Sequence, residues 1–214
     1  MRTLLVIGAS RGVGLAAVEA ALEAGFRVKA FARSAERIAA RSDRLERIEG
    51  DARDADALEA ALADVDAVAL TLGVPTDRRL LTGPITLFSE ATAQLIPAMQ
   101  RAAVRRLVCL TGFGAGDSRR AIHPLQRPPF ELLLGRAYRD KDRQEDMIRA
   151  SGLDWTLVRP GVLLPGPRTG RYRVRMERKE WRNGPITRAD VADYIVRALD
   201  DPGTIGRTPV LTAC

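Results

Sequence analysis

Aromatic residues are scarce in this chain of 214 residues, at 5% of the composition. Small aliphatic residues take their place, and these suit helices packed closely on a sheet better than a surface that stacks on nucleic-acid bases. Hydrophobic residues still make up 46% of the sequence and charged residues 29%, which is enough for one sizeable core. The composition therefore argues against disorder and against an aromatic platform for nucleic acid.

Long hydrophobic runs and a cysteine framework are also missing. No run approaches the roughly 18 apolar residues of a membrane span, and the opening residues 1–7 reach glycine too soon for a signal sequence. We therefore expect a cytoplasmic protein with no membrane partner. The two cysteines, Cys109 and Cys214, offer neither a disulfide framework nor a set of metal ligands, so no metal site is predicted.

Acidic residues are outnumbered, because 34 Lys and Arg stand against 27 Asp and Glu, a net charge of +7. Such an excess can indicate nucleic acid, an anionic membrane or an anionic small ligand. The most basic stretch, residues 171–182, alternates arginine with Tyr172, Val174 and Met176. This alternation is typical of a half-buried edge strand with those three side chains inward. Nucleic-acid binding through this stretch, with Tyr172 or Trp181 stacking, is the less favoured interpretation.

Strands and helices are expected to alternate along the whole chain. Short apolar runs bounded by turn residues are typical of parallel strands buried on both faces, and they occur at residues 3–7, 27–31, 45–48, 67–71, 106–110 and 155–158. Helical spacing or a capping residue predicts helices at 12–23, after Ser34, at 57–62 after Asp54, at 85–103, at 130–150, and at 188–199 after Thr187. A closing edge strand is expected at 209–211. The alternation predicts an α/β fold, a single-domain doubly wound parallel sheet with helices on both faces, over residues 1–214.

A glycine-rich turn follows the first predicted strand, and its candidate ligand-binding residues are Gly8, Ser10, Arg11, Gly12, Val13 and Gly14. Glycine allows backbone amides to approach a pyrophosphate, and a helix that begins there directs its free N–H groups and positive dipole end at the anion. A tight turn with close helix packing is the structural alternative. The position between an apolar strand and an alanine-rich helix favours a dinucleotide-binding site.

The residue that closes the second strand distinguishes the two nicotinamide dinucleotides. An acid at this place accepts the ribose 2′-OH of NAD, whereas an arginine favours the 2′-phosphate of NADP. Here the residue is Arg33, and Arg11 could approach the same phosphate from the glycine turn. The pair predicts NADP(H). In the alternative, Arg33 is an exposed strand end that pairs with Glu36, and Arg11 is a solvated loop residue.

Further candidate binding residues stand at the other strand ends, the edge at which open parallel sheets bind ligands. Asp51 could accept from the adenine amino group, Gly73 lets the backbone pass near the adenosine, and Thr111 offers a hydroxyl near the nicotinamide. Asp51 and Gly73 are equally consistent with roles in turns. The full set at these ends is Asp51, Ala52, Thr71, Leu72, Gly73, Thr111, Pro160 and Gly161.

These motifs resemble the atypical short-chain dehydrogenase/reductases, the NAD(P)-binding Rossmann branch that includes NmrA-like proteins and biliverdin/flavin reductases. The resemblance covers nearly the whole chain, and it rests on LVIGASRGVG near the start, GDARD at 50–54, RLVCLTG at 106–112, SGLDWTLVRPG at 151–161 and ITRADVA at 186–192. It implies a Rossmann fold and a nicotinamide cofactor. It does not imply a substrate, because this branch includes reductases, epimerase-like enzymes and cofactor sensors.

The catalytic residues depart from the pattern that the resemblance implies, a Ser with Tyr-x-x-x-Lys in which the lysine lowers the tyrosine pKa. Tyr138 and Lys141 are only three residues apart, so if Lys141 holds the ribose then Ala137 occupies the tyrosine position. Thr111 can replace the serine hydroxyl. Tyr138 is either the proton donor or a helix-surface residue, and Lys141 either binds cofactor or pairs with Glu145 one turn on.

The only histidine, His123, is a further candidate proton donor, with a solvated loop residue as the alternative. It lies in an irregular stretch, about 112–129, which together with about 162–185 is expected to cover the substrate.

Two functions agree with these features. The first is an NADPH-dependent reductase that transfers hydride to a small conjugated acceptor such as a flavin, quinone or carbonyl compound. The second is a non-catalytic NADP(H)-binding redox sensor that acts through a protein partner, and the displaced tyrosine favours it. The sequence leaves open the acceptor, the direction of hydride transfer and the oligomeric state.

Overall fold

The computed structural model describes residues 1–74 and 85–214. Its strands within these ranges are β1 (Thr3–Ile7), β2 (Arg27–Ala32), β3 (Leu45–Glu49), β4 (Ala67–Leu70), β5 (Arg106–Leu110), β6 (Asp154–Pro160), β7 (Val162–Leu164), β8 (Tyr172–Arg175), β9 (Pro185–Thr187) and β10 (Val210–Ala213). Its helices there are α1 (Gly12–Glu23), α2 (Ala55–Ala61), α3 (Leu87–Arg101), α4 (Arg127–Ala150) and α5 (Arg188–Asp200).

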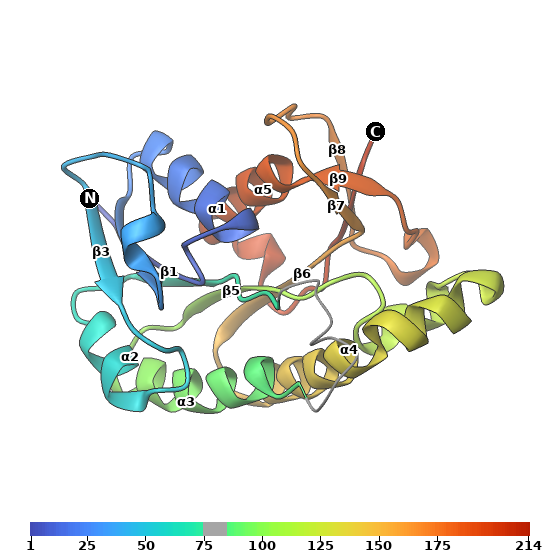
Figure 1. Ribbon diagram of the computed structural model, residues 1–214, viewed down its shortest axis with the longest axis horizontal. Helices are drawn as coiled ribbons and strands as arrows, with labels where there is room; N and C mark the ends of the chain where they lie inside the picture. The colour runs from blue at the N-terminus through green and yellow to red at the C-terminus, as the bar shows by residue number, and fades with distance from the viewer. Residues whose placement is uncertain (75–84) are drawn as a thin grey trace.

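The described residues form one eight-stranded sheet in the order β3-β2-β1-β4-β5-β6-β10-β8, and β7 pairs separately with β9 (Figure 1). All neighbours from β3 to β10 are parallel, while β8 runs antiparallel to β10. The order 3-2-1-4-5-6 is that of a doubly wound dinucleotide-binding sheet. The predicted α/β fold is therefore confirmed.

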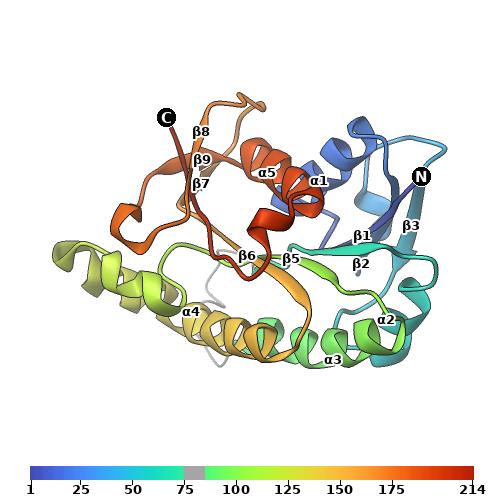
Figure 2. The ribbon, with the colours of Figure 1, turned by 180° about the vertical axis from the view of Figure 1, so that it is seen from behind.

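Helices cover both faces of this sheet. Figures 1 and 2 show α1 and α5 on one face and α2, α3 and α4 on the other, and a separate cluster of buried apolar side chains lies under each layer. Every residue of β1 and β4 is buried, as expected of strands covered on both sides. Within the described residues, no helix is both long enough and apolar enough to cross a membrane.

Two of the predicted helix caps are confirmed. The Asp54 side chain accepts hydrogen bonds from the amides of Asp56 and Ala57, and the Thr187 hydroxyl accepts one from the Asp190 amide at 3.0 Å. The helix expected from residue 130 begins instead at Arg127. Prolines occupy its next two positions, where a missing N–H is no loss.

The helix expected after Ser34 is wrong, because only a single 3-10 turn, Ala35–Arg37, forms there and Ser34 does not cap it with its side chain. The backbone of this segment finds other partners. Arg47 donates from Nε to the Ile38 carbonyl at 3.1 Å and also binds the Ala40 carbonyl, while Ile38 itself is buried. These hydrogen bonds from Arg47 fix the irregular segment that follows Ser34. The sequence pattern does not indicate them, because they come from a neighbouring strand.

The edge of the sheet also differs from expectation. The strand expected to close the sheet at 209–211 is β10, which lies inside it, because β8 pairs with its outer side and forms the edge. Tyr172 is half-buried and donates to Asp193 at 2.6 Å, but Val174, predicted to point inward, is exposed. The prediction of an edge strand in the basic stretch is confirmed, while its simple inward and outward alternation is wrong.

Close packing at the glycine turn positions α1 on the sheet. A Cβ atom on Gly14 would lie 2.1 Å from the carbonyl oxygen of Gly8 and 2.6 Å from the hydroxyl of Thr71. Thr71 is fixed in turn, because its hydroxyl and its amide both donate to the Ile7 carbonyl at 2.8 Å. Gly14 thus permits the contact between the turn and the end of β4.

Replacement of Gly14 by alanine is expected to destabilise the protein. The added methyl group meets backbone atoms that cannot move independently, so we expect Gly14→Ala to lower the free energy of unfolding by about 2 kcal/mol or more. Gly73→Ala is the matched control, because a Cβ there has no atom within 4 Å, and we expect a change within about 0.5 kcal/mol. Urea denaturation measures both, and equal stability of the two variants would contradict this packing argument.

Candidate functional site

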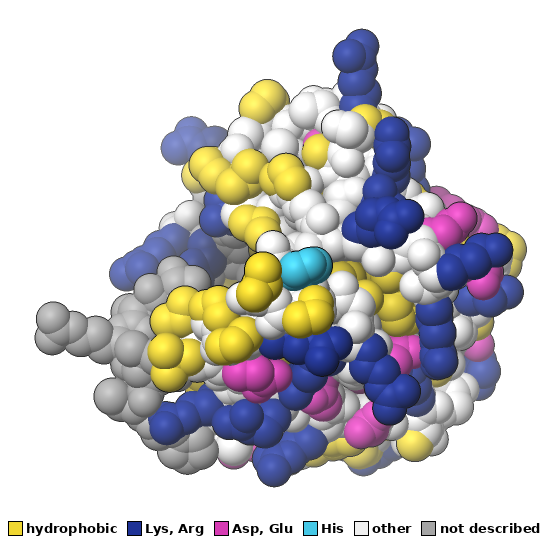
Figure 3. Space-filling view, turned by 90° about the vertical axis from the view of Figure 1, so that its right-hand side faces the viewer, with side chains coloured by type: hydrophobic (Ala, Val, Ile, Leu, Met, Phe, Trp, Pro, Cys, Tyr) yellow, Lys and Arg dark blue, Asp and Glu magenta, His cyan; other side chains and the backbone are white. Residues whose placement is uncertain are grey.

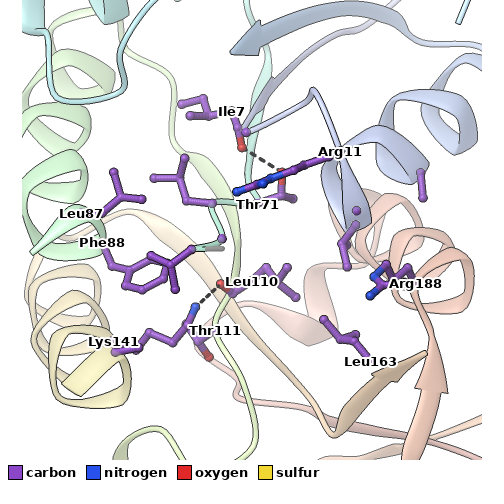
Figure 4. A pocket seen from close by; sticks show the side chains of 18 of the residues that line it. Ile7, Arg11, Thr71, Leu87, Phe88, Leu110, Thr111, Lys141, Leu163 and Arg188 are labelled. Carbon is purple, nitrogen blue, oxygen red and sulfur yellow. Dashed lines mark hydrogen bonds between the residues drawn. The ribbon is translucent and has the colours of Figure 1, made fainter. Parts of the chain in front are cut away.

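A cleft of about 1290 Å³ runs along the carboxyl ends of the parallel strands. Its walls come from the turns after β1, β2, β3, β4 and β5, from β7, from the starts of α1, α3 and α5, and from α4. Figure 4 shows part of this lining. The predicted site residues that line it are Gly8, Ser10, Arg11, Gly12, Val13, Arg33, Asp51, Ala52, Thr71, Leu72, Gly73, Thr111, Tyr138, Lys141 and Gly161. The structure therefore brings residues from across the whole sequence to one cleft.

Three predicted site residues do not line the cleft. Gly14 serves the helix packing described above, and the backbone oxygen of Pro160 accepts from the Phe113 amide at 2.8 Å. His123 is exposed, and its Nδ1 accepts from the Leu125 amide at 3.4 Å. Figure 3 shows the histidine at the surface among apolar side chains. His123 therefore lies outside the cleft, whereas its neighbour Ile122 is buried and lines it.

The glycine turn presents free backbone amides to the cleft. Gly8 and Gly12 have φ of +90° and +61°, a left-handed conformation that favours glycine. The Gly8 amide donates to the Phe31 carbonyl at 2.9 Å, which fixes the turn against β2. Arg11 is the N-cap residue of α1, but its side chain forms no capping hydrogen bond. The first turn of α1 contains no acidic residue. An anionic group such as a pyrophosphate fits these uncapped N–H groups.

Arginines surround the end of the cleft beside β2. Arg33 is exposed, and within residues 1–74 and 85–214 it makes no ion pair, whereas its expected partner Glu36 lies 3.5 Å from Arg37. The predicted alternative of an Arg33–Glu36 pair is therefore not found. Hydrogen bonds from Arg53 lower the pKa of Asp51 to about 2, against the effect of partial burial, and the charge of Arg33 acts in the same direction.

At the opposite end, the Thr111 hydroxyl donates to Glu145 at 2.8 Å. Glu145 is fully buried, and its carboxylate also accepts from Arg159 at 2.6 and 3.0 Å and from Arg149 at 3.1 Å. A threonine hydroxyl carries a single hydrogen, and that of Thr111 is used in this bond to Glu145. In this arrangement Thr111 offers the cleft an oxygen that accepts hydrogen bonds.

The Lys141 ammonium is buried beside Thr111. Its Nζ donates to the Leu110 carbonyl at 3.4 Å and lies 4.0 Å from the centre of the Phe88 ring (Figure 4). Asp140 accepts from the Phe88 amide at 2.8 Å and so holds that ring in place. Desolvation lowers the pKa of Lys141 to about 8. Among the described residues Lys141 forms no ion pair with Glu145, so that alternative is not found.

Tyr138 is half-buried, which contradicts the alternative of a helix-surface residue. Its ring centre lies 4.7 Å from that of Phe130, and a Cβ on Gly112 would come within 2.4 Å of its hydroxyl. Burial raises the pKa of Tyr138 to about 12. The phenol is therefore held next to the turn after β5, in its protonated form at neutral pH.

Sequence reasoning missed several residues of the cleft, among them Phe88, Leu163 and Arg188. In the sequence, Phe88 and Leu163 have the pattern of ordinary apolar core residues, and nothing distinguishes them from residues that only pack in the core. Arg188 carried a recognisable signal, because a cation at the first position of a helix opposes the helix dipole.

A family model described as NAD(P)H-binding matches residues 8–202. The chain is 29% identical over 210 residues to the (4-alkanoyl-5-oxo-2,5-dihydrofuran-3-yl)methyl phosphate reductase of Streptomyces griseus, covering 95% of this chain and 65% of that protein. It is 27% identical to the chloroplastic protein TIC 62 of Pisum sativum, over 74% of this chain and 32% of that one. The chain therefore spans less than two thirds of the length of these curated relatives.

Solved structures share the fold over almost the whole chain. ChuY, an anaerobillin reductase from Escherichia coli O157:H7, is 26% identical with a TM-score of 0.80, covering 99% of this chain and 97% of that one. The oxidoreductase ylbE from Lactococcus lactis has a TM-score of 0.83 at 18% identity, over 100% of this chain and 91% of that one. The second likeness is one of fold alone.

The buried lysine predicts a dependence of stability on pH. Because the pKa of Lys141 falls from 10.5 to about 8 on folding, the unfolded chain binds more protons than the folded one between these values. The free energy of unfolding of the wild type, relative to Lys141→Met, should therefore rise with pH in this window by on the order of 1 kcal/mol per pH unit. Below about pH 8 the difference should be constant, since both states are charged.

Urea denaturation of both proteins across this pH range tests the effect. Lys179→Met is the control, because Lys179 is exposed and its removal should cause no pH-dependent difference. Parallel stability profiles for the wild type and Lys141→Met would contradict the burial argument.

Proposed function

The chain belongs to the NAD(P)H-binding family of Rossmann-fold proteins, in the atypical short-chain dehydrogenase/reductase group, and from this premise we propose that it is an NADPH-dependent oxidoreductase that transfers hydride to a small conjugated acceptor. The acceptor class is a flavin, a quinone or a carbonyl compound. One observation carries the proposal: a single continuous cleft joins the glycine turn and its arginines to the buried Lys141 and its apolar surroundings. A dinucleotide and a second molecule therefore share one space.

The residues at the first end of the cleft, which the glycine turn and Arg33 form, fit the cofactor. The amides of Gly12 and Val13 would hold the pyrophosphate, and Arg33 with Arg11 would hold the 2′-phosphate, since no acid closes β2. Asp51, kept ionised by Arg53, offers an acceptor to the adenine amino group. Bound in this way, the reduced nicotinamide supplies a hydride from its C4 atom.

At the second end of the cleft, beside Lys141, side chains of this protein would orient the cofactor and the acceptor and supply a proton. The hydrogen of Thr111 is bound to Glu145 and His123 faces outward, so Tyr138 and Lys141 are the groups predicted for catalysis that keep a hydrogen for a ligand. Lys141 uses one of its three hydrogens on Leu110 and is charged below about pH 8. Its charge would stabilise the anion that an acceptor becomes on taking hydride.

The walls of the second end suit an apolar, conjugated acceptor. We propose that the segments 112–129 and 162–185 cover it, because Phe113 and Ile122 from the first and Leu163 from the second line the cleft. Exposed leucines in the first half of α4, Leu132 and Leu133, extend this apolar character to the surface. The reductases among the relatives, one acting on a furanone phosphate and one named for anaerobillin, support a reductase of a small molecule.

A second candidate function is a non-catalytic NADP(H)-binding regulator that acts through a protein partner. The observation that favours it is the position of Tyr138, whose hydroxyl is held against Gly112 with a raised pKa and is displaced by one residue from the tyrosine of the family pattern. The same cofactor end would serve this function.

Oxidation of NADPH against a panel of flavins, quinones and aldehydes, beside a calorimetric titration with NADPH, separates these functions. We expect both binding and turnover with at least one class of acceptor, because the cleft holds space and a proton donor for it. Binding without turnover would replace the reductase by the regulator, and the absence of binding would overturn both.

Arg33 should determine the preference between the two cofactors. Arg33→Asp removes a charge-assisted bond to the 2′-phosphate and adds repulsion, so NADPH binding should weaken by on the order of 2 kcal/mol or more while NADH binding hardly changes. Arg27→Asp is the control, because Arg27 is exposed at the other end of β2. Calorimetric titration with both cofactors measures the effect. Equal losses of affinity for NADPH and NADH would contradict the assignment of NADP.

A further inference from the structure

Arg188 is the first residue of α5 and the third residue of the motif ITRADVA, to which no role has been given above. Its side chain lines the cleft, and its Cδ atom lies 4.0 Å from the place where a Cβ on Gly12 would stand. Figure 4 shows Arg188 and Arg11 entering the cleft from α5 and from the glycine turn. Arg188 is therefore next to the uncapped first turn of α1.

The position of this cation is unfavourable unless an anion is near. The partial positive charge at a helix N-terminus repels a cation by some tenths of a kcal/mol. Other arginines around α5 have acidic partners, since Arg197 lies 2.9 Å and Arg168 3.5 Å from Asp193. Within residues 1–74 and 85–214, Arg188 has no such ion pair. A bound anion in the cleft would compensate its charge.

The scaffold around Arg188 is rigid. Thr187 caps α5 and pairs with Leu164 in the β7–β9 ladder. Asp190 is buried, and its carboxylate accepts from the amides of Thr169 and Gly170 at 2.8 and 2.9 Å and from the Thr169 hydroxyl at 2.8 Å. The start of α5 is thus tied to two other segments, so the arginine is presented to the cleft from a fixed base.

We propose that Arg188 is a further cofactor-binding residue, which contacts the pyrophosphate held at the glycine turn. The inference rests on the proposed dinucleotide function of the cleft. The pyrophosphate is common to both cofactors, so Arg188 contributes equally to the binding of NADH and NADPH. Arg33, at the end of β2, contributes to NADPH alone.

Titration calorimetry of the whole chain with NADPH, NADH and ADP-ribose tests this assignment. Arg188→Gln should weaken the binding of all three by about tenfold or more, because a charge-assisted hydrogen bond to phosphate is lost in each. The ratio of NADPH to NADH affinity should stay that of the wild type. Arg188→Lys should recover part of the loss, since it restores the charge without the planar fork.

Arg182→Gln is the matched control, because it removes the same charge from an exposed position outside the cleft, and it should leave all three affinities unchanged. Thermal unfolding without ligand should be alike for the control, Arg188→Lys and the wild type, and Arg188→Gln should unfold no lower, and at most about two degrees higher, because the unfavourable charge is removed. Unchanged affinity in Arg188→Gln would overturn the inference, as would a loss confined to NADPH, which would place Arg188 at the 2′-phosphate. A wild type that binds none of the three ligands would instead refute the proposed function of the cleft.

Discussion

The buried ion pair between Arg159 and Glu145 is the interaction on which the end of the cleft beside Thr111 and Lys141 depends. Both side chains are fully buried, and Arg159, at the end of β6, binds both carboxylate oxygens of Glu145 on α4. It also binds Asp117 at 2.6 Å and lies 5.1 Å from the Trp181 ring. One guanidinium thus joins a strand, a helix and both segments that flank the cleft. Removal of either partner would leave a buried charge with only its more exposed second partner, Arg149 for Glu145 or Asp117 for Arg159, and breaking a buried pair typically costs about 3–5 kcal/mol.

This pair also constrains the chemistry of its neighbours. Because Glu145 is committed to arginines, it takes the hydrogen of Thr111 and leaves Lys141 without an acidic partner among the described residues. Lys141 is instead stabilised by the Phe88 ring and the Leu110 carbonyl, and its pKa is low. This end of the cleft consequently presents the Lys141 cation and the accepting oxygen of Thr111. A ligand that becomes negative on reduction, or that carries its own N–H or O–H group, matches this polarity.

The two ends of the cleft differ in how far the sequence predicts them. The positions of the glycine turn, Arg33 and Asp51 along the cleft were predictable because they depend on local chain geometry at the ends of strands, which short motifs encode. A pair between Lys141 and Glu145 was the alternative that their spacing of one helical turn suggested, and it is not found among the described residues, because Arg159 binds Glu145 from a strand 14 residues further along. The outward side chain of His123 and the inward one of Tyr138 likewise depend on tertiary packing. The same limit applies to residues 35–44, where Arg47 binds carbonyls that a helix would have used.

The positive charge of the chain acquires a more specific meaning once its arginines are placed. Many of them are paired on the surface or buried with acids, as Arg53, Arg105 and Arg159 are. Of the described residues, Arg11, Arg33 and Arg188 converge on the cleft without ion pairs, while Asp51 and Glu19 are its acidic lining residues. This excess of positive charge lies inside a concave site, where it attracts and holds anionic small molecules. Binding of an extended nucleic acid would instead need unpaired cations spread over an outer face. The sequence alone does not say which anionic partner the net charge of +7 serves. The three arginines that converge on the cleft account for part of this charge as a site that suits a phosphate-containing small molecule.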